Sequence, residues 1–120
     1  MRIAIIGLLL LLGGRLHAEQ LGQSNQPIPP ISEYGEICAK NATFTRLPRP
    51  IYPKAARDDR LSGWSIVRYE ISEGKTKNIV LVKSSATIFE APSVAATKDM
   101  EFSPDTSLTN CVVAFHFDTK

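Results

Sequence analysis

A run of alternating side chains in the middle of the chain constrains its fold more than any other feature. Apolar and polar residues alternate from residue 63 to 71, which is the period of a strand with one buried face. Residues 72–75 form a turn in which Gly74 can take a positive φ, and residues 76–84 have the β-branched composition of a second strand. The sequence therefore predicts a β-hairpin over residues 63–84.

Two short helices and a third strand are expected around this hairpin. Pro53 suits the first turn of a helix over residues 54–60, and a second helix begins near Pro92 and ends before Pro104. Alternation returns from residue 111 to 117 and predicts the last strand. The order helix, strand, strand, helix, strand predicts a small α+β domain, with an antiparallel three-stranded sheet and two helices on one face.

The first eighteen residues are typical of a secretory signal peptide. Arg2 supplies a positive charge, residues 3–12 are largely apolar, and small and polar residues lead to a cleavage site before Glu19. The alternative is a retained anchor in the inner membrane. A membrane span needs about 20 apolar residues, and Arg15 interrupts this run after about 12 to 14. We therefore expect residues 1–18 to be removed and the mature protein to be periplasmic.

The mature chain is expected to consist of an extension, residues 19–47, and a domain, residues 48–120. Gln, Ser, Asn and a proline cluster at 27–30 dominate the start of the extension. This composition predicts an extended or disordered linker rather than a packed element.

The charge of the mature chain argues against nucleic acid as a partner. Two of the 14 basic residues, Arg2 and Arg15, lie in the signal peptide, and the others equal the 12 acidic residues in number. A protein that binds nucleic acid needs a basic surplus to neutralise phosphates. The local basic surplus from Arg46 to Arg60 is interpreted as a solvated face.

The two cysteines, Cys38 and Cys111, predict a disulfide, because an even number of cysteines in an exported chain usually pairs. The bond would close a loop of about 70 residues, for which the chain-entropy model gives roughly 4 kcal/mol of stabilisation. Two unrelated thiols are the alternative.

Five groups of residues between positions 48 and 117 fall in a known order and spacing. They are Pro50-Ile51-Tyr52-Pro53 with Ala56 and Gly63; Val67, Tyr69 and Ile71; Gly74; Ser84-Ser85; and Phe89-Glu90 with Val94, Ala96, Met100, Phe102 and Pro104. Together they resemble the C-terminal domain of TonB-type energy transducers. Ser65 departs from this pattern, since a branched apolar residue is usual there, and we expect it to weaken one core contact.

The resemblance also implies a function and a site. In the resembling family the domain captures an extended peptide of an outer-membrane receptor by β-augmentation, in transmembrane transport. We expect a protein partner, with a TonB-dependent receptor as the candidate, and no energy-harvesting part, since neither an anchor nor a long spacer is expected here. The partner-binding residues that the resemblance implies are Arg49, Ile51, Tyr52, Val112, Ala114 and His116.

A structural or assembly role in the cell envelope is the alternative function. In that role the same edge strand would join two copies into a homodimer or scaffold a complex, with no link to transport.

The sequence carries no constellation of catalytic residues. His116 and Asp118 share one face of the last strand, but a strand histidine needs no special role and a metal would lack further ligands. A Cys–His nucleophile needs a free thiolate, which the predicted disulfide removes. Neither a Gly-rich phosphate loop nor a nucleophile elbow is visible. We therefore expect no catalysis, no metal, no cofactor and no small-molecule substrate.

Overall fold

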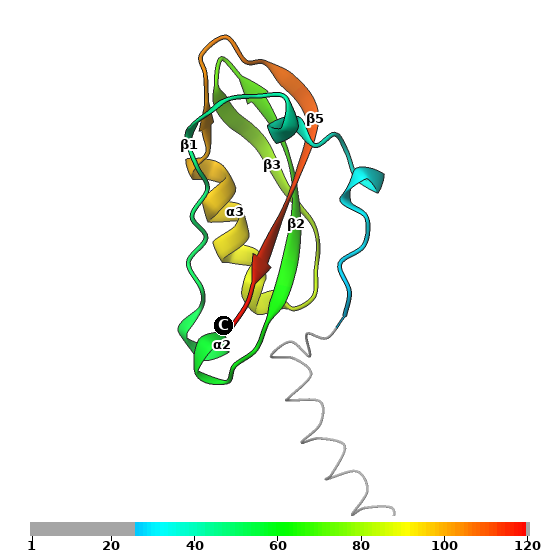
Figure 1. Ribbon diagram of the computed structural model, residues 1–120, viewed down its shortest axis with the longest axis vertical. Coiled ribbons are helices and arrows are strands. Elements are labelled where there is room, and N and C mark those ends of the chain that lie inside the picture. The colour runs from blue at the N-terminus through cyan, green and yellow to red at the C-terminus, as the bar shows by residue number, and fades with distance from the viewer. Residues whose placement is uncertain (1–25, 120) are drawn as a thin grey trace, which may run out of the picture.

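The computed structural model describes residues 26–119, so the predicted signal peptide lies outside the described residues. A twisted sheet carries the helices α2 and α3 on one side (Figure 1). None of the described helices is long and apolar enough to cross a membrane. The strands are β1 (Phe44–Arg46), β2 (Gly63–Ser72), β3 (Lys75–Ser84), β4 (Glu101–Phe102) and β5 (Leu108–Phe117). The α-helices are α2 (Lys54–Asp58) and α3 (Glu90–Asp99), and the 3₁₀ helices are η1 (Ile31–Glu33), η2 (Cys38–Lys40) and η3 (Thr87–Phe89).

The sheet has five strands within the described residues, in the order β1-β4-β3-β2-β5, and all neighbours are antiparallel. The predicted α+β class and the strands β2, β3 and β5 are confirmed, whereas the predicted number of three strands is wrong. β1 and β4 contain only three and two residues, which is too short to show a period of two. They form through a tertiary contact, since Phe44 pairs with Phe102 and the two rings stack with centroids 4.5 Å apart.

The predicted hairpin is the longest part of the sheet. Glu73 and Gly74 form its two-residue turn with φ values of 49° and 83°, as a type I′ turn requires. A Cβ at Gly74 would lie 2.5 Å from the carbonyl oxygen of Phe102, so glycine also allows the turn to approach β4. Irregularities in the β2–β3 register add to the twist of the sheet.

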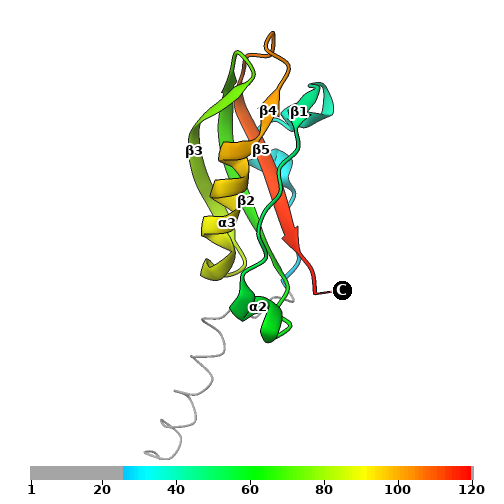
Figure 2. The ribbon, with the colours of Figure 1, turned by 90° about the vertical axis from the view of Figure 1, so that its left-hand side faces the viewer.

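Helix α3 lies along β2 and β3 and covers the main core (Figure 2). Its buried positions carry small side chains, Ser93, Ala96 and Thr97, which allow the helix to approach the strands closely. Ser65 on β2 does not leave a weak point, because its hydroxyl donates a hydrogen bond of 3.0 Å to the carbonyl oxygen of Phe89. The same oxygen accepts a hydrogen bond of 2.7 Å from Ser93, so buried hydroxyls join β2 to the start of α3.

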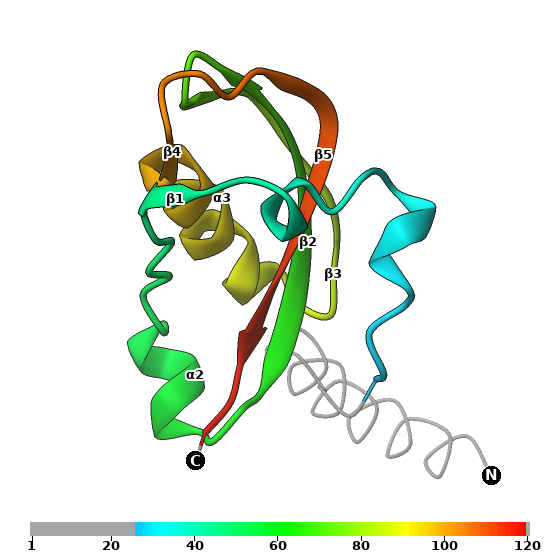
Figure 3. The ribbon, with the colours of Figure 1, turned by 45° about the horizontal axis from the view of Figure 1, so that its top comes forward.

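The N-terminal extension covers the opposite face of the sheet from α3 (Figure 3). This differs from the expected linker, because the described part of the extension, residues 26–47, packs against the domain and ends in strand β1. The reason is that β2 and β5 place large apolar side chains on both faces of the sheet. Trp64, Ile66 and Val112 form a second core, and the extension covers it with Ile28, Ile31, Tyr34 and Ile37.

The predicted disulfide between Cys38 and Cys111 is confirmed. Both residues are buried, and their Cα atoms lie 5.4 Å apart although 73 positions separate them in the chain. The bond joins η2 of the extension to β5, so it ties the cover of the second core to the edge of the sheet.

Tyr69 provides a test of the core packing. Its side chain is 1% exposed, and its hydroxyl has no hydrogen-bond partner among the described residues. Because a buried unpaired hydroxyl costs free energy, we expect Tyr69→Phe to stabilise the protein by about 1 kcal/mol in chemical denaturation. The matched control is Tyr52→Phe, which removes the hydroxyl that donates to the Leu61 carbonyl oxygen and should destabilise. A destabilised Tyr69→Phe variant would contradict the unpaired hydroxyl.

The same residue predicts a dependence on pH. Burial raises the pKa of Tyr69 to about 12 in the folded protein, above its usual value of 10.0. Between pH 10 and 12 the Tyr69 hydroxyl therefore keeps its proton in the folded protein but loses it in the unfolded chain. Its contribution to the free energy of unfolding falls as the pH rises through this range. Tyr69→Phe should lose less stability than the wild type over this range, measured as the denaturation midpoint at each pH.

Candidate functional site

Strand β5 lies at one edge of the sheet and pairs with β2 on one side only. Three of the predicted partner-binding residues, Val112, Ala114 and His116, lie on it and face the side of the sheet that carries the extension. Their exposure differs: Val112 is buried, Ala114 is half-buried and His116 is exposed. The predicted site on β5 is therefore divided into a covered and an open section.

The covered section is occupied by backbone hydrogen bonds from the extension. The N–H of Val112 donates to the carbonyl oxygen of Glu36 at 2.8 Å, and the N–H of Glu36 donates to the carbonyl oxygen of Asn110 at 2.7 Å. Glu36 thus forms a parallel bridge on the outer side of β5. In this structure an intramolecular contact therefore uses the backbone N–H of Val112, one of the predicted partner-binding residues.

The open section of β5 runs from Ala114 to Phe117, and it can be identified from the direction of the backbone groups in an antiparallel ladder. Neighbouring residues of an edge strand direct their backbone groups alternately towards the paired strand and away from it. The N–H of Val112 points away from β2, and the β2–β5 register is regular from Val112 to Phe117. The N–H and C=O groups of Ala114 and His116 therefore point to the same outer side, beyond the section that Glu36 occupies.

His116 borders a shallow depression of about 210 Å³ at the open end of β5. Its other walls include Gln26 and Ile28 of the extension together with Trp64. The indole N–H of Trp64 donates to the carbonyl oxygen of Gln26 at 3.1 Å, so the described part of the extension forms one wall of the depression.

The segment from Arg49 to Tyr52 holds the other predicted site residues, and the structure gives them different roles. Tyr52 is a structural anchor: its ring packs edge-on against Phe117, with centroids 5.7 Å apart, and its hydroxyl donates to the Leu61 carbonyl oxygen. Ile51 is 80% exposed and makes no such contact. Tyr52 therefore fixes this segment to the end of β5, and the side chain of Ile51 beside it is exposed.

Arg49 lies apart from the open section of β5. It is exposed and lines a depression of about 640 Å³ with Phe44, Leu47 and Asp99. This depression and the one beside His116 share no residue. The structure thus brings Tyr52 to β5 but does not gather all six predicted residues into one surface.

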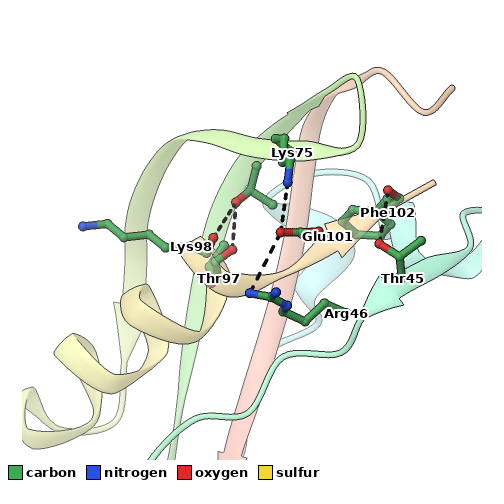
Figure 4. A network of polar contacts seen from close by, with 8 residues as sticks. Thr45, Arg46, Lys75, Thr97, Lys98, Glu101 and Phe102 are labelled. Carbon is green, nitrogen blue, oxygen red and sulfur yellow. Dashed lines mark hydrogen bonds and ion pairs between the residues drawn. The ribbon is translucent and has the colours of Figure 1, made fainter. Parts of the chain in front are cut away.

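A charged cluster that the sequence analysis did not identify lies where β1, β3 and β4 meet (Figure 4). Glu101 pairs with Lys75 at 3.0 Å and with Arg46 at 3.9 Å. The hydrogen bond from Lys75 lowers the pKa of Glu101, and the positive charge of Arg46 acts in the same direction. The cluster joins the three strands and neutralises part of the basic surplus near Arg46; its members are too far apart in sequence to form a motif.

Within residues 26–119 no group of three or more His, Cys, Asp or Glu side chains could hold a metal ion. Both cysteines are in the disulfide, so neither provides a thiolate. The features of this surface are an edge strand, exposed apolar side chains and backbone groups, which are means of binding another polypeptide.

Comparison with known proteins agrees with this description. The family model of the Gram-negative bacterial TonB protein C-terminal domain matches residues 48–119. The chain belongs to this family. Its TonB C-terminal domain is therefore a protein-interaction module, and the predicted resemblance to this family is confirmed.

Among solved structures, the TonB2 protein from Vibrio anguillarum is similar to this TonB C-terminal domain protein. The two share 19% sequence identity with a TM-score of 0.55, over 80% of this chain and 99% of that one. At this identity the likeness supports the fold. No curated protein matches the chain. The family match begins at residue 48, so the extension with Glu36 and Cys38 lies outside it.

Proposed function

We propose that this protein is a periplasmic TonB-like module that captures an extended peptide of an outer-membrane receptor by adding it as a strand to β5. The observation that carries the proposal is the open section of β5, where the backbone groups of Ala114 and His116 point away from the sheet. An unpaired edge of this kind binds a peptide through main-chain hydrogen bonds.

Two further observations support the proposal. Tyr52 holds Ile51, which is 80% exposed, on the segment that packs against the end of β5. A bound strand on β5 can therefore gain apolar contact beyond its backbone bonds. The Cys38–Cys111 disulfide supports a periplasmic location, because disulfides persist in oxidising compartments.

The test is binding of the purified protein to an array of synthetic peptides. The peptides cover the periplasm-facing segments of the outer-membrane receptors encoded in the same genome, with scrambled peptides of equal composition as controls. We expect a small set of receptor peptides to bind and their scrambled forms to bind at least tenfold more weakly. If no receptor peptide binds above its scrambled control, the receptor is not the partner and the assembly role becomes the better account.

A further inference from the structure

The extension competes with any partner for the same edge of the sheet. A strand added to β5 must use the outward backbone groups of the strand, and Glu36 already uses two of them, the N–H of Val112 and the C=O of Asn110. The bridge is one residue long, so on its own it would be easily displaced. Its persistence depends on what holds the chain on either side of it.

Three features hold Glu36 in place. Cys38 follows two positions later and is covalently bonded to Cys111, which is the bridge partner of Glu36 and lies between the two residues that Glu36 hydrogen-bonds. Ile31 and Tyr34 precede the bridge and pack on the second core. Gly35 allows the close approach, because a Cβ at this position would lie 2.7 Å from the backbone oxygen of Asn110, closer than real Cβ contacts.

We infer that the extension is a built-in occupant of the docking edge, which reserves the section from Asn110 to Val112 and limits a partner to the section from Ala114 to Phe117. The limit on the partner rests on the proposed function. The occupied section rests only on the contacts of the extension. A captured strand then forms backbone bonds to Ala114 and His116, so the module selects a short extended segment of about four residues. Gly35 and Cys38 set the length of this segment, because they hold Glu36 against Asn110 and Val112.

The occupied section can be tested without a partner, by amide hydrogen exchange measured by NMR. In the native protein the Val112 amide should exchange at least a hundredfold more slowly than those of Ala114 and His116, after correction for intrinsic rates. Gly35→Ala keeps the disulfide but forces the chain away from Asn110, and it should speed exchange at Val112 at least tenfold. Ser32→Ala, on an exposed residue of the same extension, is the matched control and should leave Val112 unchanged.

The Phe115 amide pairs with β2 and should stay slow in every variant, which shows that the sheet is intact. The extension does not occupy the edge if Val112 in the native protein exchanges as fast as Ala114. The same conclusion follows if Gly35→Ala leaves Val112 as slow as in the wild type while Phe115 is also unchanged.

The limit on the partner is tested with the receptor peptide that binds most tightly in the array. In the wild type the peptide should slow exchange at Ala114 and His116 without adding to the protection of Val112. In Gly35→Ala it should slow all three amides and bind at least threefold more tightly. Equal binding and an equal protected length in the two proteins would show that the extension is no barrier. If no receptor peptide protects any β5 amide, the proposed function fails, while the exchange rate of Val112 still decides whether the extension occupies the edge.

Discussion

Removing the Cys38–Cys111 disulfide is expected to lower the thermal unfolding midpoint by roughly 10 °C or more. The bond closes a loop between residues 73 positions apart. The chain-entropy model gives such a loop roughly 4 kcal/mol of stability, which is a large part of the net stability of a small domain. Reduction also frees the cover of the second core, so Trp64, Ile66 and Val112 lose protection from water.

The measurement is thermal unfolding followed by circular dichroism, with and without a reductant. The double variant Cys38→Ala and Cys111→Ala is the control: it should unfold near the temperature of the reduced wild type and should not respond to the reductant. An untreated protein in which both cysteines react with an alkylating agent would contradict the pairing. A midpoint that changes by less than about 2 °C on reduction would show that the bond contributes little, since this is below the shift for 1 kcal/mol in a domain of this size.

Changing Ala114 to proline is expected to weaken peptide binding at least tenfold. The N–H of Ala114 points away from β2, so proline removes a donor that the partner uses and leaves the ladder with β2 intact. The proline ring also fills the space that the incoming strand must occupy. Binding is measured as the dissociation constant of the best receptor peptide, and circular dichroism must first show that the variant is folded.

His116→Ala is the matched control for the proline variant. It removes an exposed side chain on the same outer side of β5 but keeps the backbone donor and acceptor. We expect its affinity to stay within about threefold of the wild type, because main-chain bonds dominate in β-augmentation. A folded Ala114→Pro variant with wild-type affinity would exclude β5 as the docking edge, and Arg49 to Tyr52 would be the next segment to test.

Several features of this protein were determined by the sequence alone, because they depend on residues close together or on few alternatives. The β2–β3 hairpin follows from local alternation and from the glycine at position 74, whose positive φ suits the turn. The disulfide follows from the presence of only two cysteines in a chain that is predicted to be exported, which leaves one pairing. The family follows from a set of motif residues between Pro50 and Pro104 that lie close together in the chain, and the family match spans them.

Other features were decided only by the tertiary structure, because they depend on contacts between distant residues. β1 and β4 exist through the pairing of Phe44 with Phe102, and neither is long enough to leave a pattern. The packing of the extension depends on a second apolar face of the sheet, which Ile28, Ile31, Tyr34 and Ile37 cover. Their spacing of three matches neither the period of a strand nor the i, i+3, i+4 pattern of an amphipathic α-helix. The proposed docking edge is the clearest case. Alternation placed Val112, Ala114 and His116 on one face, but only the fold shows that Glu36 uses the backbone of Val112, while no other described residue uses the outward backbone groups of Ala114 and His116. A backbone hydrogen bond depends on the path of the main chain and hardly on the type of side chain. The pattern of residues in the sequence therefore does not predict it.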